Sequence, residues 1–199
     1  SWQDRYETFV LHHADLASEV HADAFIIGGN DLGPAMPGGL LADGTSSGVP
    51  ADIENWWNLL ITNIRTHYAG DLFWAIPYSG ELSKLPDFIV NVDSIYVMWS
   101  APLSDLQTPT HAQLEEQFGK KLDTDIVSLK DAYDKPIVIG LDYPSVDGSS
   151  AGCFDFEGAC LSFSDLDQPI EYMTDSTVDM QEQYDIYSAS LTAINQRDW

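Results

Sequence analysis

Short apolar runs that end at glycine, proline or polar residues recur along this chain, and amphipathic segments separate them. The clearest run, Ala24–Gly28, contains only apolar residues and glycine, and Gly29, Asn30 and Asp31 follow it directly. Such a run is typical of a strand buried on both faces, as in parallel sheets. Because site residues of α/β proteins follow the carboxyl ends of parallel strands, Asn30 and Asp31 are candidate site residues. The alternative is a polar turn, with Gly28 and Gly29 at positive φ.

The alternation of helix and strand extends over the whole chain. Apolar residues at three- and four-residue spacing predict helices over residues 4–21, 52–68, 110–133 and 178–196. Apolar runs predict further strands over residues 72–78, 94–99 and 135–143. We therefore expect a single α/β domain over residues 1–199, with parallel strands joined by right-handed crossovers. Four parallel strands form either an open sheet or part of a barrel.

Polar and aromatic residues also stand where the later strands end. Tyr78 ends the second predicted strand and Glu81 follows it, Trp99 ends the third, and Asp142 and Tyr143 end the fourth. Since these strand ends meet at one edge of a parallel sheet, we take these five residues as further candidates for the site.

The charge of the chain restricts its partners. The 32 acidic residues against 8 Lys and Arg give a net charge of −24, so nucleic acids and anionic membranes are not expected partners. No apolar run is long enough to span a bilayer. Candidate calcium ligands occur late in the chain without the spacing of an EF-hand, and no other metal or cofactor is expected. These ligands are Asp165, Asp167, Asp175 and Asp179.

The two cysteines, Cys153 and Cys160, lie in a short loop bounded by glycines. Their spacing differs from the Cys-x-x-Cys pattern of zinc and redox sites. We interpret them as a small disulfide-closed loop, which indicates an oxidising, extracellular or cell-surface setting. Two unpaired thiols are the alternative.

Several stretches resemble one family in the order in which that family carries them. The family comprises TIM-barrel glycoside hydrolases related to β-mannanases, known as family 113. Residues 6–28 resemble its third helix and fourth strand, and residues 135–139 resemble its seventh strand. Further matches are the loops at residues 101–105 and 143–148 and the helix near residues 181–187.

The resemblance implies an α/β chain that supplies strands four to seven of a (β/α)8 barrel. We then expect this chain to be a piece of a larger barrel, completed by remaining barrel segments or by other copies of the chain. Retaining members of such families use two carboxylates about 5 Å apart, one as acid/base and one as nucleophile. Asp31 takes the acid/base place and Asp142 is the carboxylate nearest to the nucleophile place, which falls near Gly140.

The chain departs from the family pattern where the chemistry should occur. Aspartate or glycine stands where glutamates are expected, so we predict a degenerate two-carboxylate site and leave catalysis open. Trp99, Tyr78 and Tyr143 would form a sugar-stacking platform, with Asn30 and Glu81 as further sugar contacts. The expected function is that of a carbohydrate-active extracellular domain that binds polysaccharide or oligosaccharide. The alternative is a non-catalytic glycan-binding or structural module of a cell-surface or filamentous assembly.

Overall fold

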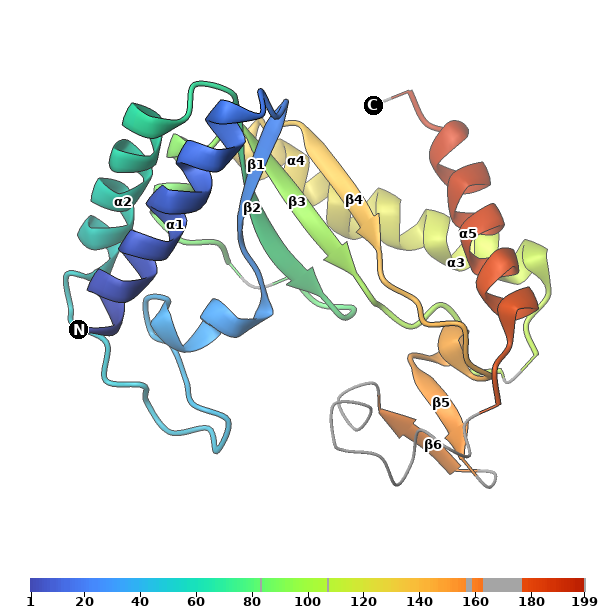
Figure 1. Cartoon of the computed structure of the whole chain (residues 1–199). Helices are drawn as coiled ribbons and strands as arrows, with labels where there is room; N and C mark the ends of the chain where they lie inside the picture. The colour runs from blue at the N-terminus through green and yellow to red at the C-terminus, as the bar shows by residue number, and fades with distance from the viewer. Residues whose placement is uncertain (83, 107, 157–158, 163–176, 199) are drawn as a thin grey trace. The chain divides into compact units, whose positions relative to one another are not determined.

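The computed structural model describes residues 1–82, 84–106, 108–156, 159–162 and 177–198 (Figure 1). The α-helices are α1 (Trp2–Glu19), α2 (Ile53–His67), α3 (His111–Lys121), α4 (Val127–Tyr133) and α5 (Met180–Asn195). The strands are β1 (Ala24–Gly28), β2 (Asp71–Tyr78), β3 (Ser94–Trp99), β4 (Ile137–Leu141), β5 (Cys153–Phe156) and β6 (Ala159–Ser162). The 3₁₀ turns are η1 (Asn30–Ala35), η2 (Asp87–Asn91) and η4 (Ser149–Ala151), and η3 (Leu122–Ile126) is a π-helical turn.

The first four strands form one sheet in the order β1-β2-β3-β4. β1 pairs in parallel with β2, in a register that runs from Ala24 opposite Asp71 to Gly28 opposite Ala75. Neighbours in the sheet are also neighbours in the sequence, as in a barrel in which each strand is followed by its crossover. The predicted α/β class with a parallel sheet is confirmed.

The chain divides into two compact units, each of which is assembled from separate segments. The first unit contains β1, most of β2, β3 and β4, and helices α1 and α2; its segments are Ser1–Pro77, Ser83–Met98 and Tyr133–Gly140. The second unit contains the last residues of β2, β3 and β4 together with α3, η3, η4, the β5–β6 hairpin and α5; its segments are Tyr78–Leu82, Trp99–Ala132 and Leu141–Trp199.

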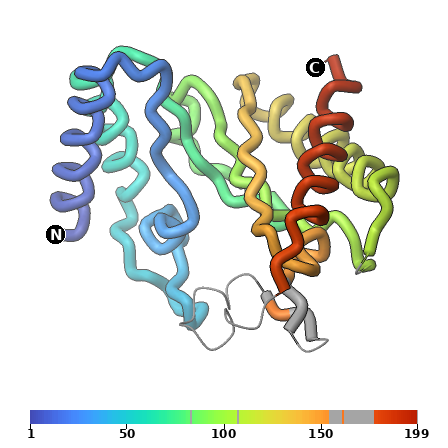
Figure 2. The backbone as a smooth tube through the Cα atoms, turned by 45° about the vertical axis from the view of Figure 1, so that its right-hand side comes forward, coloured from blue at the N-terminus to red at the C-terminus, as the bar shows by residue number. Residues whose placement is uncertain are grey.

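The core of the first unit is centred on Trp57 of α2. This side chain is fully buried, and its ring lies 5.3 Å from that of Trp74 and 5.6 Å from that of Phe88, centroid to centroid. The indole N–H donates a 3.0 Å hydrogen bond to the carbonyl of Ala35, which attaches the loop after β1 to α2. Helices α1 and α2 lie side by side (Figures 1 and 2).

The core of the second unit lies where α3 packs along α5 (Figures 1 and 2). Thr110 begins α3 with a capping box, as expected for a helix start at this residue. The helix predicted over residues 110–133 is not a regular α-helix throughout, because η3 interrupts it between α3 and α4. The apolar residues whose spacing predicted this helix are nonetheless buried except Tyr133: Leu114, Phe118, Leu122, Ile126 and Leu129.

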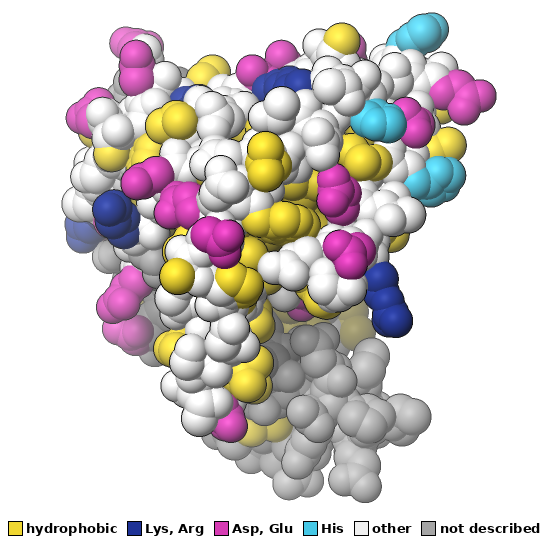
Figure 3. Space-filling model, turned by 90° about the vertical axis from the view of Figure 1, so that its left-hand side faces the viewer, with side chains coloured by type: hydrophobic (Ala, Val, Ile, Leu, Met, Phe, Trp, Pro, Cys, Tyr) yellow, Lys and Arg dark blue, Asp and Glu magenta, His cyan; other side chains and the backbone are white. Residues whose placement is uncertain are grey.

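Acidic side chains are spread over the face seen in Figure 3, with few Lys or Arg among them. This distribution agrees with the net charge of −24. Among the described residues, no helix combines the length and the apolar character that crossing a bilayer requires.

Candidate functional site

The glycines after β1 determine where the first candidate residues lie. Gly28 and Gly29 have φ of 99° and 111°, as the sequence predicted. A Cβ on Gly28 would come within 2.6 Å of the carbonyl oxygen of Ala75, so only glycine allows this approach of β1 to β2. The chain then turns into η1, which carries Asn30 and Asp31 with exposed side chains.

Asp31 lies beside a mainly apolar groove of the first unit. The groove has a volume of about 340 Å³ and is lined by residues of α1 and β1, including Tyr6, Phe9 and Ile26. Burial raises the pKa of the Tyr6 phenol to about 12, despite a hydrogen bond with the Gly28 backbone that lowers it. Tyr6 therefore stays protonated over the physiological pH range. Of the residues that line the groove, Asp31 is the one predicted to take the acid/base place.

Asp142 follows β4 and belongs to the second unit. Its backbone N–H donates to the carbonyl of Trp99 at 2.8 Å, and its side chain is exposed. The structure therefore leaves the carboxylate of Asp142 open to solvent at the end of the fourth strand. The two predicted catalytic residues, Asp31 and Asp142, lie in different units.

Gly140, in the first unit, stands near the place where the resemblance puts the nucleophile. The phenol of Tyr96 occupies the space that a side chain at this position would need. A Cβ built on Gly140 would lie 2.0 Å from the Tyr96 Oη atom and 2.4 Å from its Cζ atom. As the structure stands, no carboxylate can extend from position 140. This obstruction could not be predicted from the sequence, because Tyr96 lies on the neighbouring strand β3.

The aromatic residues predicted to stack on sugars are brought together, but inside the second unit. Tyr78 and Trp99 are fully buried and Tyr143 is only 2% exposed. The Trp99 ring lies 4.6 Å from the Tyr78 ring and 4.3 Å from the Phe118 ring, centroid to centroid. A buried ring offers no free face to a sugar, so we correct this expectation: these aromatic residues form core, not a platform.

The hydroxyls of both tyrosines are used within this core. The Tyr78 hydroxyl donates to the carboxylate of Asp125 in η3, and the Tyr143 hydroxyl donates to the carbonyl of Ala101 at 2.5 Å. Burial raises the pKa of both phenols, and the hydrogen bond to Asp125 raises that of Tyr78 further. Both therefore stay protonated over the physiological pH range and attach the ends of β2 and β4 to the unit.

Glu81, by contrast, lines an open cleft of the second unit. The cleft has a volume of about 790 Å³ and is formed by the loops after β2 and β3 and by one face of α3. Sequence reasoning missed the contribution of α3, which supplies Gln117 and Lys121. The signal was present, since Gln113, Gln117 and Lys121 recur every four residues on the polar side of the predicted helix.

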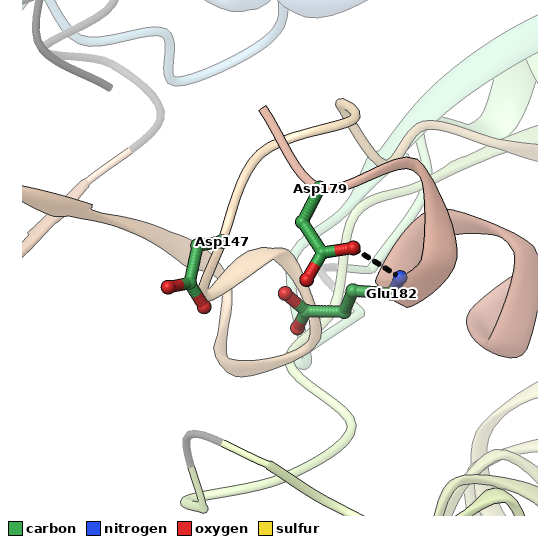
Figure 4. Close-up of side chains that lie close together, drawn as sticks. All are labelled: Asp147, Asp179 and Glu182. Atoms are coloured by element: carbon green, nitrogen blue, oxygen red, sulfur yellow. Dashed lines mark hydrogen bonds between the residues drawn. The ribbon is translucent and has the colours of Figure 1, made fainter. Parts of the chain in front are cut away.

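Three carboxylates converge at the start of α5 (Figure 4). One oxygen from each of Asp147, Asp179 and Glu182 lies within 4.8 Å of the others. The Glu182 carboxylate accepts from the backbone N–H groups of Gly148 and Ser150, each at 2.8 Å, and Asp179 caps α5 by accepting from the Glu182 N–H at 2.8 Å. These bonds attach the loop before β5 to α5, which is a sufficient structural role for the cluster.

The remaining candidate ligands and cysteines are only partly described. Asp179 is the one predicted calcium ligand within the described residues, and Asp165, Asp167 and Asp175 lie outside them. Cys153 and Cys160 lie on adjacent strands of the antiparallel β5–β6 hairpin, where Cys160 is opposite Asp155. The side chain of Cys160 is not among those described, so the pairing stays a prediction.

The fold and the strand-end residues together define a class, an α/β chain with the strand–crossover order of a TIM barrel. Solved structures of glycoside hydrolase family 113 share this fold. The structure of a β-1,4-mannanase of that family covers 100% of this chain, with a TM-score of 0.63 and 19% sequence identity. A second structure, of a β-1,4-mannanase complex, also covers 100% of the chain, with a TM-score of 0.60 and 18% sequence identity. The structure of the β-mannanase AaManA of Alicyclobacillus acidocaldarius, in complex with ManMIm, covers 96% of the chain, with a TM-score of 0.59 and 18% sequence identity.

The predicted resemblance to family 113 is thereby confirmed at the level of the fold. The chain spans about half the length of these structures, between 47% and 49%. No protein-family model matches the sequence, and no curated protein matches it either.

Proposed function

We propose that this chain is a carbohydrate-binding domain with a glycoside hydrolase-like fold and a degenerate two-carboxylate site. The observation that carries the proposal is the match of the whole chain to structures of β-1,4-mannanases. A fold does not determine a function by itself, but it locates the strand ends at which ligands bind. Exposed polar residues occur at those ends here: Asn30, Asp31, Glu81 and Asp142.

The degenerate character is supported by position 140. A retaining hydrolase needs a nucleophilic carboxylate on a rigid strand end, held within a fraction of an ångström. Gly140 has no side chain, and the Tyr96 phenol fills the space beside it. Asp142 has to serve instead, two residues further on and exposed to solvent. We therefore expect binding of sugar without efficient turnover.

The second candidate function is retaining glycoside hydrolysis. In that case Asp31 would protonate the glycosidic oxygen, and Asp142 would attack the anomeric carbon or position a water molecule. The exposed carboxylates at the ends of β1 and β4 favour it. The side chain of Asp31 is one methylene shorter than that of glutamate, and a displacement of about 1 Å costs on the order of a hundredfold in rate.

A panel of β-linked oligosaccharides separates the two candidates. Isothermal titration calorimetry measures binding, and release of reducing ends measures hydrolysis. Binding without release, unchanged in Asp31→Asn and Asp142→Asn, supports the binding domain. If reducing ends are released and either substitution abolishes their release, the hydrolase is supported. If the protein neither binds the oligosaccharides nor releases reducing ends, a carbohydrate function is refuted.

We also propose that the domain works outside the cytoplasm, and the two cysteines in one short hairpin support this. A free-thiol assay on the native oxidised protein tests this. Two reactive thiols would remove the argument from Cys153 and Cys160.

A further inference from the structure

The cleft that contains Glu81 has the features of a ligand site. Its volume of about 790 Å³ falls within the range of roughly 300–1,000 Å³ of small-molecule sites. Two of its three walls are loops that follow β2 and β3, the ends at which α/β folds place their ligands. The third wall is α3, and all three belong to the second unit.

Side chains of α3 provide a row of polar groups along this wall. Gln113, Gln117 and Lys121 are each four residues apart and so lie on one side of the helix. The Lys121 Nζ atom lies 5.9 Å from the centroid of the Tyr78 ring, and this cation–π contact with a buried ring restrains the ammonium group. Gln113 uses its carbonyl oxygen in the capping box of α3, where it accepts from the backbone N–H of Thr110, so this oxygen is already engaged within the protein.

The charges of the cleft select against anions. Two carboxylates, those of Glu81 and Asp105, line it together with one ammonium group, that of Lys121. A phosphate, sulfate or uronate would meet a net negative wall on a protein whose net charge is already −24. The lining instead combines donors and acceptors, which suits hydroxyl groups because each of them donates and accepts.

Apolar side chains complete the lining. Pro102, Leu103 and Leu106 also face the cleft, and Leu106 is 51% exposed. Such side chains can cover the C–H face of a pyranose ring while the polar residues bind its hydroxyls. From this combination we propose that the cleft between the loops after β2 and β3 and helix α3 binds a neutral oligosaccharide. The inference rests on the proposed carbohydrate function and names a site and a substrate class for it.

The test uses β-1,4-mannohexaose as the probe and calorimetry on the full chain. Glu81→Gln replaces one carboxylate oxygen, an acceptor, by an amide donor, and Gln117→Ala removes an amide altogether. Both side chains are exposed, so the fold should persist; thermal melting checks this. We expect the Kd to rise about tenfold in each variant, the cost of one lost hydrogen bond to a ligand. The matched control is Glu116→Gln, the same chemical change on α3 outside the cleft, which should leave the Kd unchanged.

The outcomes distinguish the two levels of the proposal. Binding of the probe that the cleft variants leave unchanged would overturn the cleft as the site, while the carbohydrate function would stand. No binding of any β-linked oligosaccharide in the panel would overturn both. Binding of an oligouronate more tightly than of mannohexaose would overturn the assignment to neutral sugars.

Discussion

Replacing Gly140 by alanine tests whether Tyr96 blocks the expected nucleophile place. The new Cβ would lie 2.0 Å from the Tyr96 Oη atom, whereas ordinary contact begins at 3.4 Å, so the phenol has to move by about 1.4 Å. Over-packing of this kind costs about 1–3 kcal/mol. Gly140 has no positive φ, so alanine also gains about 0.4–1 kcal/mol by restricting the unfolded chain. Subtracting the gain from the cost leaves an expected net loss of roughly 0–2.6 kcal/mol in the free energy of unfolding.

The same substitution should have the opposite effect once the phenol is removed. In a Tyr96→Ala background the clash is absent and only the gain from the unfolded state remains, so Gly140→Ala should be neutral or stabilising. Urea unfolding of the wild type, both single variants and the double variant at one protein concentration measures this cycle. An equal effect of Gly140→Ala in both backgrounds would refute the reasoning, because it would mean that Tyr96 does not occupy this space.

Three further predictions concern the whole fold. The melting temperature should rise from low to moderate salt, because screening relieves the repulsion within a chain of net charge −24. A melting temperature that does not change with salt would contradict this. Adding calcium at equal ionic strength distinguishes binding at a specific site from screening. In the described sheet, the outer strands β1 and β4 carry the exposed residues Ile26 and Val138. Sedimentation of this 199-residue chain should therefore reveal association. A compact, cooperatively melting monomer would contradict this prediction. Partial burial raises the pKa of Asp93, but hydrogen bonds from the Leu72 N–H and the Arg65 guanidinium lower it by more. The pKa of Asp93 is therefore below its usual value. The stability that Asp93 contributes should therefore be complete above about pH 4 and fall as the pH drops further, and Arg65→Gln should flatten this fall in urea titrations; an unchanged slope would count against it.

The strands and their parallel order were predictable because their signal is local. The apolar run Ala24–Gly28 predicted a strand, and the glycines at its end predicted a turn at positive φ; both are found. The expectation that this strand is buried on both faces was wrong, because Ile26 is 46% exposed. The helix over residues 110–133 was predictable, but its π-helical turn was missed. The signal lay in the four-residue steps from Leu114 to Ile126, which drift around a helix of 3.6 residues per turn. A wider turn at η3 keeps these residues on one side.

The site was less predictable because it depends on contacts between distant segments. Tyr78 and Trp99 do end strands, but the local sequence does not determine whether an aromatic residue at a strand end faces solvent or core. Here Phe118 of α3 packs on Trp99. The cleft combines residues from loops and a helix that are far apart in the sequence. The obstruction of Gly140 by Tyr96 likewise requires the sheet to be known.

The central claim, that this chain binds a neutral β-linked oligosaccharide without hydrolysing it, is tested most directly by saturation-transfer difference NMR with β-1,4-mannohexaose. Irradiation of protein methyl protons reports binding, and the reducing-end signals of the same sample report cleavage over time. We predict transfer of saturation to the sugar ring protons and reducing-end signals that stay constant over days. Absence of transfer, or a steady growth of new reducing ends, would contradict it.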